Sequence, residues 1–281
     1  MITETGNTYT EKLSWSEFLT HTQVMPFPER QASCVTLDPY TDIFQGKGIR
    51  KYQDAIDLAV KGWKEGAKLV AQQTKKYVDL ISAKVERLDY RYDVEGIGID
   101  IGRYCEGIPE CWVSPQYTQV DGVGQHLVRI CVNVGALGRR SVSEIERRGI
   151  AIATFVEVME YAGKSVELSI CFPAISHDSK TSTLIVRVKE FDQRLDSDKV
   201  AYALIHPAKH RCLKFRWIEL LPESWWNSFR GSYGSSRDLS VSEQANFDVY
   251  VPSIETVCPR ESEMETWITK LLKDNDVKFT D

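Results

Sequence analysis

The sequence predicts an α/β protein whose central sheet has a parallel core, preceded by a helical segment. Two observations carry this prediction. Residues 126–136 and 165–174 ("HLVRICVNVGA" and "SVELSICFPA") are apolar runs typical of buried strands, and the pattern of residues 143–161 between them predicts a helix. A strand, a helix and a strand of these lengths form a right-handed crossover, which makes the two strands parallel.

The segments before this unit differ from it in pattern. Residues 1–45 contain three prolines and show no sustained period, so we expect an extended arm. Over residues 46–90, apolar side chains recur at three- or four-residue steps, which predicts helix, and Gly62 and Gly66 are expected to kink or split it. An α/β domain over residues 91–281 follows these two segments.

Within that domain the alternation of structure continues. The capping-box pairs Ser141 with Glu144 and Ser143 with Glu146 mark the start of the central helix. Residues 222–250 are rich in serine, glycine and aromatic residues and are expected to form a long loop. Further strands are expected at 89–102, 182–191 and 212–220, and further helices at 196–205 and 262–274.

Composition narrows the class of protein. Hydrophobic residues make up 42% and charged residues 27% of the 281 residues, which is ordinary for a soluble globular chain. The chain has no apolar run long enough to span a membrane and no signal-peptide pattern at its start, so we expect a cytoplasmic protein without membrane contact. A net charge of −5 argues against coating duplex nucleic acid but leaves room for a local basic patch.

Residues 130–149 ("ICVNVGALGRRSVSEIERRG") form a strand–turn–helix junction of the kind that often holds phosphates or metals. "GALGRRS" lacks the spacing and the lysine of a phosphate-binding P-loop. "GIGIDIG" has Ile101 where the dinucleotide-binding fingerprint requires its third glycine. Both nucleotide motifs are therefore excluded, and no cofactor is expected.

The order of strand, serine-containing loop, apolar helix ending "EVMEYAGKSVELSICF" and strand resembles the first βαβ unit of von Willebrand factor A-type domains. The resemblance implies a Rossmann-like fold of that type. Such domains hold a divalent cation with an Asp-x-Ser-x-Ser motif, but here Asn133, Gly135 and Leu137 occupy the three positions. A hard cation needs several oxygen ligands, so we expect no metal site.

Three segments resemble a family of uncharacterised tailed-phage proteins known as a domain of unknown function. They are "GIGIDIGRYCEGIPECW", "RRGIAIATFVEVMEYAG" and "ALIHPAKHRCLKFRWIE", within about residues 90–220. This resemblance implies a phage source and a host-cell cytoplasmic location. It implies no particular activity.

Catalytic signatures are weak. His206 and His210 have the spacing of metal ligands on a helix, but Pro207 lies between them, so exposed or capping histidines are the preferred interpretation. A group of acidic residues fits either an acid/base or two-metal site or, preferably, a solvated hairpin face: Asp93, Glu95, Asp100, Glu106 and Glu110. We expect a non-enzymatic protein, with an enzyme left open.

Two groups of residues are candidates for binding a partner. The first group consists of cations near strand and helix ends: Arg139, Arg140, Arg147, Arg148, Lys209, Arg211, Lys214 and Arg216. The second group mixes aromatic residues and arginines in the expected loop: Trp225, Trp226, Phe229, Arg230, Tyr233 and Arg237. Aromatic side chains beside arginines suit single-stranded nucleic acid, whereas a loop that folds its tryptophans into the core is the alternative.

The leading hypothesis is therefore a phage accessory protein that binds nucleic acid, with single-stranded DNA preferred, or a phage or host polymerase during transcription or replication. The alternative is a protein-interaction scaffold without nucleic-acid binding, for example a partner of an ATPase, as the von Willebrand A-like resemblance implies. In that case the arginines of residues 139–140 grip acidic side chains instead of phosphates.

Overall fold

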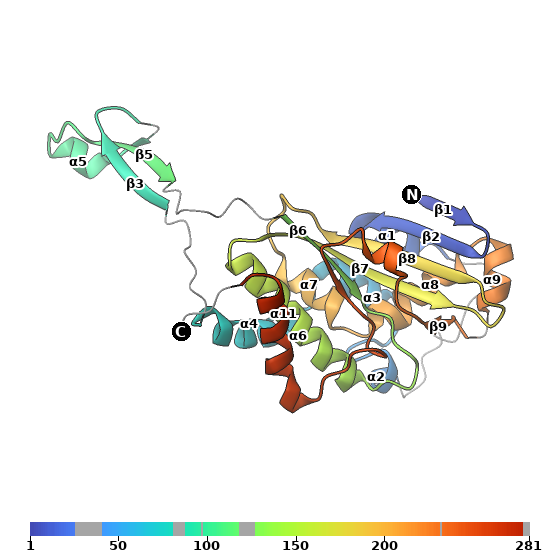
Figure 1. Cartoon of the computed structure of the whole chain (residues 1–281). Helices are drawn as coiled ribbons and strands as arrows, with labels where there is room; N and C mark the ends of the chain where they lie inside the picture. The colour runs from blue at the N-terminus through green and yellow to red at the C-terminus, as the bar shows by residue number, and fades with distance from the viewer. Residues whose placement is uncertain (26–40, 81–87, 97, 118–126, 231, 278–281) are drawn as a thin grey trace.

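The computed structural model describes residues 1–25, 41–80, 88–96, 98–117, 127–230 and 232–277, and these form a mixed α/β structure (Figure 1). The larger sheet has the strand order β1–β2–β8–β7–β6–β10, and β9 pairs with β7. Its strands are β1 Ile2–Thr5, β2 Thr8–Ser14, β6 Leu127–Asn133, β7 Ser165–Ile175, β8 Thr181–Lys189, β9 Ser235–Ser236 and β10 Val249–Val251.

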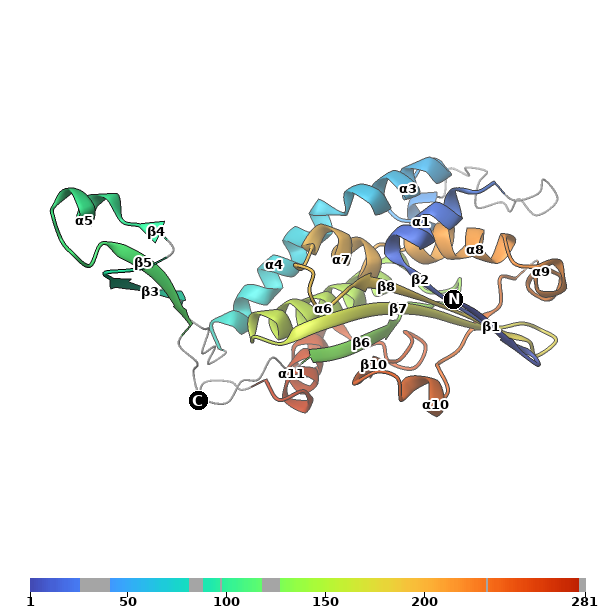
Figure 2. The ribbon, with the colours of Figure 1, turned by 90° about the horizontal axis from the view of Figure 1, so that it is seen from above.

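Helices cover this sheet. Figure 2 shows α3, α4 and α7 on one side of the sheet and α10 on the other. The helices described are α1 Trp15–Gln23, α2 Thr41–Phe44, α3 Tyr52–Lys61, α4 Lys64–Val78, α5 Ile101–Cys105, α6 Val142–Tyr161, α7 Ser197–Leu204, the π-helix η3 Lys209–Lys214, α8 Phe215–Glu219, α9 Glu223–Phe229, α10 Val241–Gln244, the 3-10 helix η4 Glu261–Glu263 and α11 Met264–Asp274.

The predicted crossover is confirmed. β6 pairs in parallel with β7 and also with β10, so the centre of the sheet is parallel as expected. Ser141 caps α6 through a capping box with Glu144, which fixes where the helix begins. At Gly149 an added Cβ would lie only 2.5 Å from the Leu204 carbonyl oxygen, so a glycine here lets α6 lie against α7. The sheet also contains antiparallel pairs, including β7 with β8.

The helical prediction for residues 46–90 is confirmed over α3 and α4. Gly62, with a φ of +77°, separates the two helices, whereas Gly66 lies inside α4 against the Trp63 ring. A left-handed φ of this kind costs glycine little, which is why the helix breaks at that residue.

The first residues do not form the extended arm that we predicted. β1, β2 and α1 occupy residues 2–23, and β2 pairs in parallel with β8 from Thr8 with Thr181 to Ser14 with Arg187. The alternation in "TYTEKLS" has the period of a strand, with Tyr9 and Glu11 buried, and it is too short to stand out from a polar background. The predicted arm's residues 26–40 lie outside the described part of the chain.

Two predictions for residues 212–250 are wrong. The expected strand at 212–220 is helical and buried almost throughout, over η3 and α8, because an apolar run with buried sides fits a core helix as well as a strand. The expected loop at 222–250 contains α9, β9, α10 and β10. The capping box between Ser240 and Glu243 was a readable signal for α10.

A second sheet lies apart from the larger one (Figure 1). Its order is β3–β5–β4, and it consists of β3 Leu88–Asp93, β4 Gly98–Ile99 and β5 Trp112–Tyr117, with α5 between β4 and β5. The single strand expected at residues 89–102 is thus divided between β3 and β4. We call the described residues from 88 to 117 the lobe.

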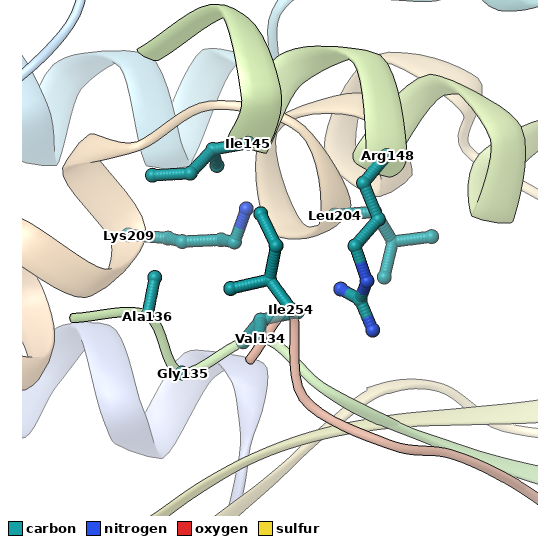
Figure 3. A pocket seen from close by; sticks show the side chains of 8 residues that line it. All are labelled: Val134, Gly135, Ala136, Ile145, Arg148, Leu204, Lys209 and Ile254. Carbon is teal, nitrogen blue, oxygen red and sulfur yellow. The ribbon is translucent and has the colours of Figure 1, made fainter. Parts of the chain in front are cut away.

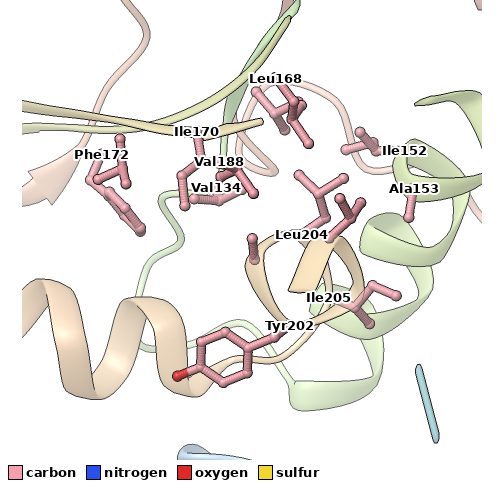
Figure 4. Close-up of a cluster of buried hydrophobic side chains, with 14 of the residues drawn as sticks. Val134, Ile152, Ala153, Leu168, Ile170, Phe172, Val188, Tyr202, Leu204 and Ile205 are labelled. Atoms are coloured by element: carbon pink, nitrogen blue, oxygen red, sulfur yellow. The ribbon is translucent and has the colours of Figure 1, made fainter. Parts of the chain in front are cut away.

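The main hydrophobic core lies between the larger sheet and the helices. Figure 4 shows part of it, where Leu168, Ile170 and Val188 of the sheet face Ile152 of α6 and Leu204 of α7. In the part of the chain that the structure describes, none of the helices combines the length and the apolar character needed to cross a membrane.

Candidate functional site

The loops that follow β6 and β10 meet at the carboxyl end of the sheet, because these two strands are parallel neighbours. The chain leaves β6 through α6 to reach β7 on one side, whereas β10 lies on the other side. Ligands of open α/β sheets bind beyond the carboxyl ends of strands at such a divergence. We call residues 134–141 and 252–257 the β6–β10 junction.

A polar network closes the base of the junction. The Asn133 side chain accepts a hydrogen bond from the Gly135 N–H at 3.0 Å and donates one to Asp238 at 3.0 Å. Asp238 also accepts hydrogen bonds from the Ser253 N–H at 2.7 Å and the Thr256 hydroxyl at 2.5 Å. Burial would raise the pKa of the Asp238 carboxyl, but these hydrogen bonds outweigh burial and lower the pKa. The side chain of Asn133 is therefore fully engaged by protein groups.

The two arginines of the turn hold a carboxylate of the chain itself. Arg140 Nε donates to both oxygens of Glu255 at 3.1 and 3.2 Å, and Arg139 reaches the same carboxylate at 3.3 Å. The Leu137 N–H adds a third donor at 3.1 Å. Burial raises the pKa of Glu255, but the hydrogen bonds from Arg140, Leu137 and Arg139 and the charge of Arg140 together outweigh burial, so the pKa is lowered. The turn therefore binds an anionic group.

Arg147 and Arg148 point to different places. Arg148 is buried and donates to the backbone carbonyl oxygens of Val257, Asn133 and Pro252, so it ties α6 to the loop after β10. Burial lowers its pKa to about 10. Arg147 instead lines a groove of about 530 Å3 between α4, α6 and α11.

The four cations of residues 209–216 are all buried, so the expectation that they form a basic surface is wrong. Arg211 donates to the Phe44 carbonyl at 2.6 Å and to the Arg140 carbonyl at 2.5 Å, and Lys214 donates to the Tyr233 carbonyl at 2.7 Å. Arg216 pairs with Glu219 at 2.9 Å, and both side chains are almost fully inaccessible. The cations thus hold backbone segments together from inside the protein.

Lys209 differs from the other three. It is 1% exposed, and its Nζ makes no hydrogen bond or ion pair with any residue that the structure describes. Figure 3 shows this ammonium group pointing into a small cavity lined by Val134, Gly135, Ala136, Ile145, Arg148, Leu204 and Ile254. The cavity has about 10 Å3, roughly the room of one water molecule. Burial, followed by the nearby charge of Arg148, lowers the pKa of Lys209 well below its usual value.

His206 and His210 are buried as well, so the preferred interpretation of exposed or capping histidines is wrong for these two residues. His206 stacks on Tyr202 with ring centroids 5.6 Å apart, and its Nδ1 accepts the Ala208 N–H at 3.2 Å. His210 stacks on Phe172 at 6.1 Å. Burial lowers the pKa of His206 to about 4, so the ring is neutral at physiological pH.

The aromatic group is divided between core and surface. Trp225, Trp226 and Phe229 are buried, which confirms the alternative that this segment folds its tryptophans into the core. Tyr233 stacks on Phe215 with centroids 4.2 Å apart. Two arginines complete the group: Arg230 is exposed, whereas Arg237 is mostly covered and donates to the Asp238 carbonyl at 2.8 Å.

The five acidic residues of the acidic group all lie in the lobe. Asp100 caps α5 by accepting the Arg103 N–H at 3.1 Å, and Asp93 accepts the Val94 N–H at 2.8 Å. Within the described residues, no three histidine, cysteine or acidic side chains cluster in a way that could hold a metal. These carboxylates have local roles and do not form one constellation.

The fold defines a class: a mixed α/β protein whose larger sheet has a parallel centre. The chain belongs to the family described as "Domain of unknown function (DUF7192)", whose model matches residues 3–277. No curated protein and no solved structure matched the chain.

The sequence did not reveal the acidic side of the junction. Glu255 and Asp238 lie more than 100 residues from the groups that bind them, Arg140 and Asn133. The one local signal is the polar run Ser253, Glu255 and Thr256 directly after a strand, at the place where an open α/β sheet binds ligands.

Proposed function

We propose that the protein is a non-enzymatic interaction scaffold that uses its lobe to dock a protein partner. The observation that carries this proposal is the exposure of large apolar side chains on a small, poorly buried unit. Between 39% and 74% of the surface of each of these side chains is exposed: Tyr92, Val94, Ile99, Ile101 and Tyr104. All five lie between residues 92 and 104, and exposed apolar side chains gathered in one small unit are typical of an interaction site.

Few of the lobe's described side chains are buried. Among its residues whose side chains are described, Cys111 alone is classed as buried. A three-stranded sheet normally needs a packed hydrophobic face for stability. A partner that covers the exposed apolar side chains would supply that packing.

Charge defines the kind of partner. Residues 88–117 contain six acidic residues and two arginines, a formal net charge of −4 against −5 for the whole chain. Opposite charge at the rim of an interface speeds association and selects partners. The partner is therefore a protein with an apolar patch bordered by lysine or arginine, and the ATPase implied by the von Willebrand A-like resemblance is a candidate of that class. A phage source for both proteins stays a prediction.

Nucleic-acid binding has less support. The acidic lobe repels phosphates, and the buried residues from the two candidate groups offer neither charge nor ring faces to a strand. Arg139 and Arg230 are the members of those groups that remain exposed. A polymerase with such a basic, apolar patch belongs to the same class of partner for the lobe.

The test compares the wild-type chain with one triple variant and one double variant. Val94→Ser, Ile101→Ser and Tyr104→Ser remove apolar surface from the lobe, and Ile43→Ser with Val241→Ser remove equally exposed side chains, 72% and 84% exposed, elsewhere. Partners are captured from the source cells after nuclease treatment, and each candidate is then purified and titrated against the three proteins by calorimetry. We expect the lobe variant to lose binding by at least about tenfold, about 1.4 kcal/mol, and the control to bind as the wild type does.

Equal binding by the lobe variant and the control would contradict the proposal. Capture that disappears on nuclease treatment, together with oligonucleotide binding that weakens steeply with salt, would instead favour the nucleic-acid hypothesis.

A further inference from the structure

We propose that the β6–β10 junction is a binding site for a phosphate-class oxyanion and that Glu255 occupies this site as an internal substitute for the ligand. This site is separate from the lobe, and the inference does not depend on the proposed docking function. It assigns a ligand class to the turn that joins β6 to α6.

The cradle around Glu255 has the composition of an oxyanion site. One backbone N–H, from Leu137, and two guanidinium groups, from Arg139 and Arg140, converge on one carboxylate at 3.1–3.3 Å. Guanidinium groups hold carboxylate and phosphate oxygens in the same way, and backbone N–H groups in such turns also bind anions. The three donors are therefore already placed to bind an anion, because they bind the carboxylate of Glu255.

The second observation is independent of that cradle. Lys209 is 99% buried and points into the cavity beside Gly135 and Ala136 (Figure 3). Among the described residues its Nζ makes no hydrogen bond or ion pair, and the nearby charge of Glu146 acts on it without direct contact. Burying a lysine side chain without a hydrogen bond or an ion pair costs stability, because direct contacts do not replace the lost water. An anion in the cavity would remove this cost, and the Glu255 carboxylate does not supply it, because its contacts are with Leu137, Arg139 and Arg140.

The cradle around Glu255 and the cavity at Lys209 are adjacent. Ile254 lines the Lys209 cavity and immediately precedes Glu255, so the residue that fills the cradle is adjacent to the residue that closes the cavity. Release of Glu255 from the arginines would free Ile254 to move and would open the cavity to the cradle. Arg148 anchors the same loop on both sides, through the carbonyls of Pro252 and Val257, which confines that movement to the residues between.

A tetrahedral oxyanion fits the enlarged space better than a second carboxylate does. It has enough oxygen atoms to bind the arginines and the Leu137 N–H and to reach the Lys209 ammonium as well. Its second negative charge also balances the cations that Glu255 leaves uncompensated. Inorganic phosphate and a phosphate monoester share this chemistry.

The experiment titrates inorganic phosphate into the full-length wild type, Glu255→Gln, and the double variant Glu255→Gln with Lys209→Met. Binding is measured by calorimetry, and the folding of each variant is checked by circular dichroism. We expect Glu255→Gln to bind phosphate at least about tenfold more tightly than the wild type and the double variant to lose that gain. Glu263→Gln, which removes a carboxylate from an exposed pair with Arg260, is the matched control and should bind as the wild type does.

A second measurement keeps the test valid if Glu255→Gln does not fold. In the wild type, phosphate added in excess should shift the amide NMR signals of Leu137 and Gly135, and acetate at the same ionic strength should shift them less. Titration with phenyl phosphate identifies the source, since equal affinity indicates a phosphorylated molecule and absent affinity indicates free phosphate; either result supports the site.

Three results would overturn the proposal. They are the same affinity for phosphate in the wild type and in Glu255→Gln, unchanged binding after Lys209→Met, and a stronger response to acetate than to phosphate. The lobe variant with three serine substitutions should bind phosphate normally, so a failure here is distinguishable from a failure of the docking function.

Discussion

The helical segment 209–219 and the lobe reverse the usual relation between residue type and place. The segment carries four buried cations, and three of them bond to backbone carbonyl oxygens or a carboxylate. The lobe carries tyrosines, isoleucines and a valine, and leaves five of these side chains exposed. Clusters of charge and clusters of apolar residues therefore do not by themselves identify surface and core in this chain.

The largest expected effect comes from the aromatic side chains. Trp225→Ala should lower the free energy of unfolding by about 3–5 kcal/mol, because the ring is buried against Tyr9 with centroids 5.5 Å apart. Tyr104→Ala in the lobe should change it by no more than about 0.5 kcal/mol, as exposed substitutions usually do. Urea unfolding followed by circular dichroism measures both. Similar losses in the two variants would remove the contrast between the buried core and the lobe.

Two ion pairs, each between residues three positions apart, allow a buried pair to be compared with an exposed pair. Arg216→Ala should cost at least about 3 kcal/mol, because it leaves Glu219 without its pair in the interior. Arg260→Ala, which breaks an exposed pair with Glu263, should cost at most about 1 kcal/mol. The same unfolding experiment applies, and a small loss for Arg216→Ala would show that water reaches the buried pair.

The buried His206 should make stability depend on pH. Its folded-state pKa of about 4 lies below the ordinary value of 6.5, so the unfolded chain takes up the proton more readily. This contribution is therefore complete above pH 6.5 and is lost as the pH falls from 6.5 to 4, by about 3 kcal/mol. Unfolding curves across that range should be less steep in pH for His206→Gln, whereas His177→Gln, an exposed control, should keep the wild-type slope.

The smallest effect separates the two arginines of the turn. Arg140 is 20% exposed and bonds to Glu255, Glu144 and the Ile254 carbonyl, so Arg140→Ala should cost about 1–2 kcal/mol. Arg139 is 74% exposed, and Arg139→Ala should stay within about 0.5 kcal/mol. Thermal unfolding of the two variants side by side measures the difference, and equal values would mean that Glu255 depends on neither arginine more than on the other.

The sequence predicted those elements whose signals are local. Ser141 with Glu144 located the start of α6, Gly62 located the break between α3 and α4, and the apolar runs of β6 and β7 set the parallel centre of the sheet. In each case the residues that determine the element lie within a few positions of one another.

Where tertiary contacts decide, the sequence was misleading or silent. The spacing of the cations at 209–216 indicates an exposed face. Arg211 and Lys214 are nevertheless buried, because the carbonyl oxygens of the distant residues Phe44 and Tyr233 accept their hydrogen bonds. The turn lies at the carboxyl end of the sheet as expected, but the carboxylate that meets it was not predicted, because Glu255 and Arg140 are 115 residues apart. Likewise, no local pattern shows that Ile101 and Tyr104 lack a covering partner.

The pairing of β3 with β5 has a consequence for how the chain is assembled. Leu88 lies opposite Tyr117 in the antiparallel register, so the chain enters and leaves the lobe at points about 5 Å apart. In the described residues, the lobe strands pair only among themselves and leave the register of the larger sheet unchanged. A unit with adjacent ends can be exchanged for another without disturbing the larger sheet that carries it, so the docking function that we propose for the lobe would change with the replacement of this one unit.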